Sequence, residues 1–173
     1  MQIDTDSWQK MHNKLGASGA TPPTPVYIAV YALTRGAGID ASYALQELRE
    51  SSTVWRNWVL TDGGLLAHTE LEFAAENYDS YAEDGLRRGN PSGSIEAIVR
   101  QGWVRRLDTV TSLQIDAVGR LMGFRLSWLP VGDIKLTFAD GAEAILPGQM
   151  RLSQQDWEWS DRFINTLRDR VQL

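Results

Sequence analysis

The sequence has no cysteine, only two histidines and three lysines among its 173 residues, and no long hydrophobic run. The absence of cysteine excludes disulfides, thiol nucleophiles and thiolate metal ligands, and it fits a reducing compartment. The most apolar segment, residues 26–33, is far shorter than the roughly 20 residues that cross a bilayer. The first residues are acidic where a secretory signal is basic. We therefore expect a cytoplasmic protein without a membrane span.

Metal and nucleotide sites lack their usual sequence signals. His12 and His68 do not have the spacing of paired zinc ligands, and neither common glycine-rich phosphate loop occurs. We expect His68 on the solvent side of a strand, and we predict no metal and no cofactor. Acidic residues outnumber Lys and Arg by 22 to 17, and the net charge of -5 argues against binding to nucleic acid phosphates.

The N-terminal region has the composition of an arm followed by a linker. Trp8, Met11 and Leu15 stand at spacings of three and four, which is typical of a short amphipathic helix. The segment after them is rich in Gly, Ser and Pro, as linkers are. We predict an arm and linker over residues 1–24 and a single domain over residues 25–173.

Three segments outside the hairpins described below have less decisive patterns. Residues 26–33 are apolar on every face, so periodicity does not separate strand from helix, and their β-branched and aromatic content favours a strand. Asp40 is a candidate helix N-cap, and residues 43–49 continue with helical propensity. Residues 78–94 are rich in turn-forming residues and predict an exposed loop.

Two segments carry the pattern of β-hairpins. Residues 53–61 lead through Asp-Gly-Gly into residues 65–73, where apolar and polar side chains alternate. Residues 134–138 lead through Asp140-Gly141 into residues 143–146 in the same way. Further strands are predicted at residues 110–115 and 124–128, and a strand or short helix at residues 95–101.

The C-terminal segment has the clearest helical period. Trp157, Ile164, Leu167 and Val171 form an apolar stripe after a capping motif that begins at Ser153. Hairpins followed by one amphipathic helix indicate an α+β fold with a mainly antiparallel sheet.

Four segments in this order resemble bacterial pleckstrin-homology-like domains over about residues 54–173. They are Trp58-Val59-Leu60-Thr61-Asp62-Gly63-Gly64-Leu65-Leu66, Leu107-Asp108-Thr109-Val110-Thr111-Ser112-Leu113, Leu136-Thr137-Phe138-Ala139-Asp140-Gly141 and the closing helix through Phe163 to Leu167. The resemblance implies a curved barrel or sandwich closed by the C-terminal helix. It also implies a role in binding partners rather than in catalysis. Residues 26–50 depart from the family pattern at the position of its first strand.

Charged residues are segregated in the middle of the chain. Residues 70–84 are acidic, and residues 87–106 contain five arginines and a single acidic residue. The two stretches either neutralise each other, which we favour, or leave an arginine patch for an acidic partner. Glu70 and Glu72 share a strand face and could hold a cation or divide acid and base roles. We favour a solvated face that blocks edge pairing.

Tryptophan is abundant, with seven residues, and aromatic anchors are typical of protein interfaces. Trp58 and Trp159 are less easily buried, because each has a neighbour two residues away that competes for the same face or stripe. The candidate partner-binding residues are Trp8, Trp58, Arg87, Arg88, Arg105, Arg106 and Trp159.

These patterns favour a non-enzymatic protein-binding module, an adaptor or regulatory subunit. It would recognise a protein partner or a second copy through an aromatic and arginine surface or a sheet edge. One alternative is a winged-helix DNA-binding regulator with helices over residues 26–33, 40–50 and 52–60. The other is a small carboxylate-dependent enzyme, for which the candidate residues are Asp62, Glu70 and Asp79.

Overall fold

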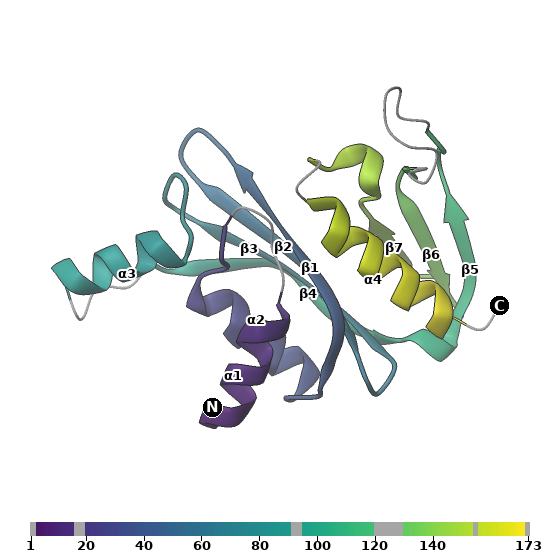
Figure 1. Ribbon diagram of the computed structural model, residues 1–173, viewed down its shortest axis with the longest axis horizontal. Helices are drawn as coiled ribbons and strands as arrows, with labels where there is room; N and C mark the ends of the chain where they lie inside the picture. The colour runs from purple at the N-terminus through teal and green to yellow at the C-terminus, as the bar shows by residue number, and fades with distance from the viewer. Residues whose placement is uncertain (1–2, 16–19, 91–94, 120–129, 154–155, 172–173) are drawn as a thin grey trace. The chain divides into compact units, whose positions relative to one another are not determined.

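The computed structural model of the chain describes residues 3–15, 20–90, 95–119, 130–153 and 156–171. The chain divides into two compact units, Met1–Arg105 and Arg106–Leu173. Each unit combines helices with a β-sheet, and the strands are antiparallel (Figure 1). The predicted α+β class is therefore confirmed. Among the described residues, the strands form one sheet of four strands and one of three strands. The predicted barrel or sandwich therefore stays a prediction.

The sheet of the first unit has the strand order β1-β2-β3-β4. These strands span Ile39–Leu48, Thr53–Thr61, Leu65–Phe73 and Ala97–Arg106. Since β2 and β3 lie in the middle, β1 and β4 form the two edges of the sheet. Of residues 95–101, for which a strand or a helix is predicted, residues 97–101 form the first half of the edge strand β4.

The first predicted hairpin is confirmed in its bounds and its turn. Leu60 pairs with Leu66, and the Gly64 N–H donates to the Thr61 carbonyl at 3.0 Å. Gly64 has a φ of 74°. Glycine adopts this left-handed conformation with little strain because it has no Cβ. Trp55, Val59 and alternate residues of β3 form the apolar core beneath two helices.

Helix α1 (Thr5–Lys14) confirms the amphipathic helix predicted for the arm. Asp4 caps it by accepting a hydrogen bond from the Ser7 N–H at 2.8 Å. Hydrogen bonding with Ser7 lowers the pKa of Asp4. Met11 and Leu15 are buried in the core, and Ser42 of β1 donates to the Lys14 carbonyl at 2.6 Å. The helix is thus part of the packing of the first unit.

The strand predicted for residues 26–33 is wrong, because helix α2 (Thr24–Thr34) occupies this segment. Pro25 lies in the first turn of the helix. Proline is tolerated there because backbone N–H groups of the first turn make no hydrogen bond within the helix. Val26 and Val30 are one turn apart and both are buried against the sheet. The Thr24 N–H donates to the Glu83 carboxylate at 2.7 Å, which supplies the absent cap.

The helix predicted from Asp40 is also wrong, because these residues form β1. Nine positions of β1 pair with β2, whereas helix propensities differ by only about 0.7 kcal/mol per residue among ordinary residues. Two of the three helices that a winged-helix fold requires, over residues 40–50 and 52–60, are therefore strands. This architecture does not fit the chain.

The loop predicted over residues 78–94 contains helix α3 (Ser80–Gly89). Asp79 caps it by accepting a hydrogen bond from the Ala82 N–H at 2.9 Å. The glycines in this segment indicated a loop, although they only weaken a helix that has a cap. Residues 91–94 lie outside the described part of the chain.

The second unit contains the other predicted hairpin. Its sheet has the order β5-β6-β7, formed by Val110–Ile115, Ile134–Phe138 and Glu143–Leu146. Short 3-10 helices precede β5 at Leu107–Thr109 and follow β7 at Gln149–Arg151. The strand predicted at residues 124–128 lies outside the described residues.

Helix α4 (Trp157–Arg170) confirms the predicted C-terminal helix and runs along the three-stranded sheet (Figure 1). Leu167 of its apolar stripe and Phe163, one turn earlier, are fully buried, as are alternate residues of β6. Ser153 donates to the Asp156 carboxylate at 2.5 Å just before the helix. The division of the chain into an arm over residues 1–24 and a single domain over residues 25–173 stays a prediction.

The packing of α1 leads to a test of whether the arm is separable. We expect Met11→Ala to lower the free energy of unfolding by about 2–5 kcal/mol, because it removes a buried side chain and leaves a cavity. Urea denaturation followed by circular dichroism measures this. Gln9→Ala, on the exposed side of α1, is the control and should change it by less than about 0.5 kcal/mol. Equal values for the two variants would mean that the arm does not contribute to the core.

Candidate protein-binding surface

A row of aromatic side chains crosses the four-stranded sheet. Tyr43 stacks on Trp58 with ring centroids 4.8 Å apart, Trp58 lies 4.9 Å from His68, and His68 lies 5.4 Å from Trp103. One residue comes from each strand, from β1 to β4. Tyr43 and Trp58 are direct partners in the register, as are Trp58 and His68. The row is on the face opposite α2, since successive side chains of a strand alternate between faces.

His68 is buried within this row, so the expectation of a solvent-facing histidine is wrong. Only 5% of its surface is exposed. Its Nδ1 lies 3.0 Å from the Asn57 carbonyl oxygen, and the neutral ring donates its proton there. Burial lowers the pKa of His68, and the bond to Asn57 offsets part of this shift. Burial therefore favours the neutral form of His68.

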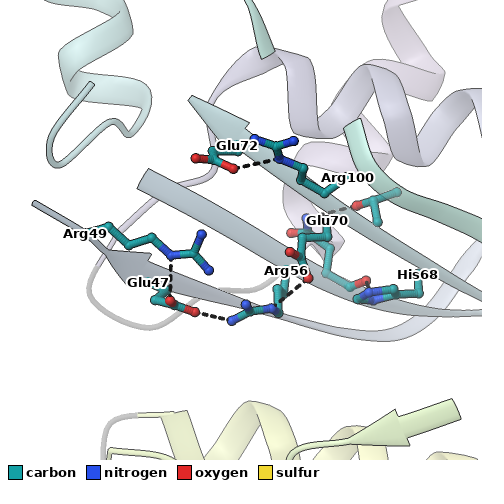
Figure 2. Close-up of polar contacts among 9 residues, drawn as sticks. Glu47, Arg49, Arg56, His68, Glu70, Glu72 and Arg100 are labelled. Atoms are coloured by element: carbon teal, nitrogen blue, oxygen red, sulfur yellow. Dashed lines mark hydrogen bonds and ion pairs between the residues drawn. The ribbon is translucent and has the colours of Figure 1, made fainter. Parts of the chain in front are cut away.

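A second row, of ion pairs, crosses the same sheet (Figure 2). Arg56 of β2 pairs with Glu47 of β1 and, through Nε at 2.9 Å, with Glu70 of β3. Arg49 binds Glu47 through its Nε at 2.7 Å. The hydrogen bonds from Arg49 and Arg56 lower the pKa of Glu47. Glu47 therefore stays ionised between its two arginines.

The ion-pair row reaches β4 through Glu72 and Arg100. Arg100 donates from Nε to the Glu72 carboxylate at 2.7 Å, and this bond lowers the pKa of Glu72. The predicted edge-blocking role of Glu70 and Glu72 is wrong, because β3 is an inner strand. Each of the two carboxylates instead has an arginine partner. No cluster of three potential metal ligands occurs among the described residues.

Both rows end on the edge strand β4, which differs from the inner strands in its exposure. None of its ten residues is buried, whereas six of the nine residues of β3 are. The exposed fractions of Ile98, Val99 and Val104 are 47%, 59% and 40%. β4 also contains Arg100, Arg105 and Arg106 but no acidic residue. It thus presents apolar and basic side chains beside a sheet edge.

The structure places the predicted site residues on several elements. Arg105 and Arg106 are on β4, where Arg106 Nε lies 3.0 Å from Asp108 Oδ1. Arg87 and Arg88 are exposed on α3, and Trp159 is half-buried on α4 of the second unit.

The two remaining site residues are tryptophans that contact other rings. Trp8 of α1 lies 5.5 Å from the Tyr27 ring, and both residues line a pocket that Arg87 also reaches. The expectation that Trp58 is poorly buried is wrong, since it is 3% exposed. Binding of a partner by these seven side chains stays a prediction.

The acidic and arginine-rich stretches pair with each other at two points, as we favoured. Arg100 binds Glu72, and Arg87 binds Glu83 with an Nη2 to Oε1 distance of 3.3 Å. Glu83 is nearly buried and also binds the first N–H of α2, so this pair connects α3 to α2. Glu70 instead pairs with Arg56 from outside the arginine-rich stretch.

The three carboxylates proposed for catalysis do not converge. Asp62 lines a cavity near α1, Glu70 is held by Arg56, and Asp79 caps α3. The pair of acid and base that a carboxylate-dependent reaction needs is thus not formed by these residues.

No family model, no curated protein and no solved structure matches the chain. The resemblance to pleckstrin-homology-like domains therefore stays a prediction. Among the described residues, no helix has the length and apolar composition needed to span a bilayer.

Sequence reasoning named Arg105 and Arg106 of β4 as candidates but missed the exposed apolar residues of the same strand. The segment contains adjacent apolar residues at Ile98 and Val99, followed by Arg100, so a strand here places one apolar side chain on each face. That this strand is an edge follows only from the strand order.

The burial of His68 predicts how stability depends on pH. Its folded-state pKa is below the ordinary value of about 6.5. The unfolded state therefore binds more protons, and the stabilisation present above pH 6.5 is lost as the pH falls toward the folded-state pKa. We expect a slope of up to about 1.4 kcal/mol per pH unit in this range.

Urea denaturation at intervals from pH 7.5 to 5 measures that slope. His68→Gln should flatten it, and His12→Gln, a change at an exposed histidine, serves as the control. The pKa values of Glu47 and Glu72 are lowered, so these groups affect stability at more acidic pH and not between pH 7.5 and 5. An equal slope in the native chain and the His68 variant would contradict the assignment.

Proposed function

We propose that this chain is a protein-binding module that adds an extended acidic segment of a partner protein to the free edge of β4. The observation that carries the proposal is the exposure of this strand, whose only neighbour among the described strands is β3. An edge strand presents a row of unpaired N–H and C=O groups, and β-strand addition uses these groups for affinity.

The opposite edge of the sheet is less suited to this role. β1 contacts α1, and Ser42 and Ala44 of β1 are buried there. β4 instead exposes Ile98, Val99 and Val104, which can pack against alternate side chains of an added strand.

The charges of β4 favour an acidic partner over a second copy. Pairing two β4 strands would bring the arginines of both copies close together, and like charges on paired strands are destabilising. Arg100 uses Nε for Glu72 in an exposed ion pair, and such pairs contribute only about 0–1 kcal/mol. A carboxylate of the partner can therefore share this guanidinium at little cost.

The proposal is tested with capped peptides that are long enough to span β4. We expect a peptide of alternating Glu and Val to bind about tenfold more tightly than one of alternating Lys and Val, because only the first matches the arginines. Titration followed by amide nuclear magnetic resonance measures both affinities. The amides of β4 should also gain protection from hydrogen exchange.

Charge-reversal variants locate the binding surface. Arg105→Glu should weaken binding of the Glu-Val peptide about tenfold. Arg162→Glu makes the same charge change at an exposed position of α4 and should leave binding unchanged. Equal binding of both peptides, or protection away from β4, would overturn the proposal. Light scattering that shows a dimer disrupted by Arg105→Glu would assign the edge to a second copy instead.

A further inference from the structure

A cavity of about 490 Å³ lies in the first unit, away from β4. Its walls come from α1, the end of α2 with the loop that follows, and the turn between β2 and β3. Its volume falls within the range of about 300–1,000 Å³ that small-molecule sites occupy. The site is independent of the function proposed for the sheet edge.

Two of the three lysines of the chain line this cavity. Lys10 and Lys14 are four residues apart on α1 and therefore share one side of the helix. Met11 and Leu15 anchor the helix in the core, which fixes the lysine side toward the cavity. The positive charge of the wall is thus set by the packing of α1.

The two lysines have no acidic partner within the described residues. The third lysine, Lys135, is instead paired with Glu143 at 2.7 Å. Like charges at this helical spacing destabilise each other by about 0.2–0.5 kcal/mol. An anion placed between Lys10 and Lys14 would offset this repulsion. The overall charge of the chain is -5, so the two lysines form a local positive site on an acidic protein.

The remaining walls limit the kind of anion that fits. Tyr31, Ile39 and Met11 provide apolar surface, and Ser7 and Asn13 provide hydrogen-bonding groups. The carboxylate of Asp62 lies against Gly38, where an added Cβ would be 2.3 Å from Oδ2. This fixed negative charge opposes a second anionic group at that side of the cavity.

We propose that this cavity binds a small organic phosphate, with the phosphate between Lys10 and Lys14 and the organic part against Tyr31 and Ile39. A phosphate monoester carries a charge of about -1.5 to -2 at neutral pH, which matches two ammonium groups. Lysine binds phosphate as a compact point charge, so the site does not require the planar geometry of arginine.

The small number of lysines allows a direct test. Reductive dimethylation with ¹³C keeps the lysine charge and gives one resolved signal for each labelled lysine, which Lys→Gln variants assign. The protein is titrated with glycerol 3-phosphate and with inorganic phosphate, and chloride and acetate at matched ionic strength are the controls. We expect the signals of Lys10 and Lys14 to shift and saturate while that of Lys135 stays in place.

Variants in the unlabelled protein separate binding from general charge effects. We expect Lys10→Gln and Lys14→Gln each to weaken binding of glycerol 3-phosphate about tenfold in calorimetry, with Lys135→Gln as the matched control. Shifts of all three lysine signals without saturation, or no shift at all, would overturn the site. Binding of citrate as tight as that of glycerol 3-phosphate would overturn the assignment to phosphate.

Discussion

The antiparallel pairing of β2 with β3 is the constraint on which the first unit depends. Its register places Trp58 opposite His68 and Arg56 opposite Glu70, so the aromatic row and the ion-pair row both follow from one alignment. On the other face, the same register places Trp55 and Val59 beneath α2. A shift by one residue would move every one of these side chains to the wrong face. The hairpin turn at Gly64 therefore has consequences across the whole sheet.

The two faces of this sheet hold their polar groups in different ways. On the face beneath α2, Asn57 and Thr69 are buried, and the Asn57 side-chain N–H donates to the Thr69 hydroxyl at 3.0 Å. On the opposite face, Arg56 and its carboxylate partners keep part of their surface in solvent. Pairs of this kind add little stability because they are screened. Their effect is to fix the direction of side chains along the sheet as far as Arg100.

Placing β2 and β3 inside the sheet leaves β1 and β4 as edges with different surroundings. Helix α1 contacts β1 through Ser42, and the cavity forms beside this contact. β4 has β3 as its only neighbour among the described strands, and it exposes apolar and arginine side chains. One edge is thus part of the core and the other is a surface. This asymmetry separates the cavity beside α1 from the exposed edge at β4.

The sequence by itself determined the features that depend on neighbouring residues. The alternation in residues 65–73, the Asp-Gly turns and the stripe of α4 each predicted an observed element, because burial of one face imposes its period on the chain. Residues 26–33 and 40–49 were assigned wrongly, since a run that is apolar on all sides fits either structure and helix propensity yields to strand pairing. Only the tertiary structure decided that β4 is an edge, that His68 is buried and that Lys10 and Lys14 face a cavity. Strand order and helix docking bring together residues far apart in the chain, and no local pattern records them.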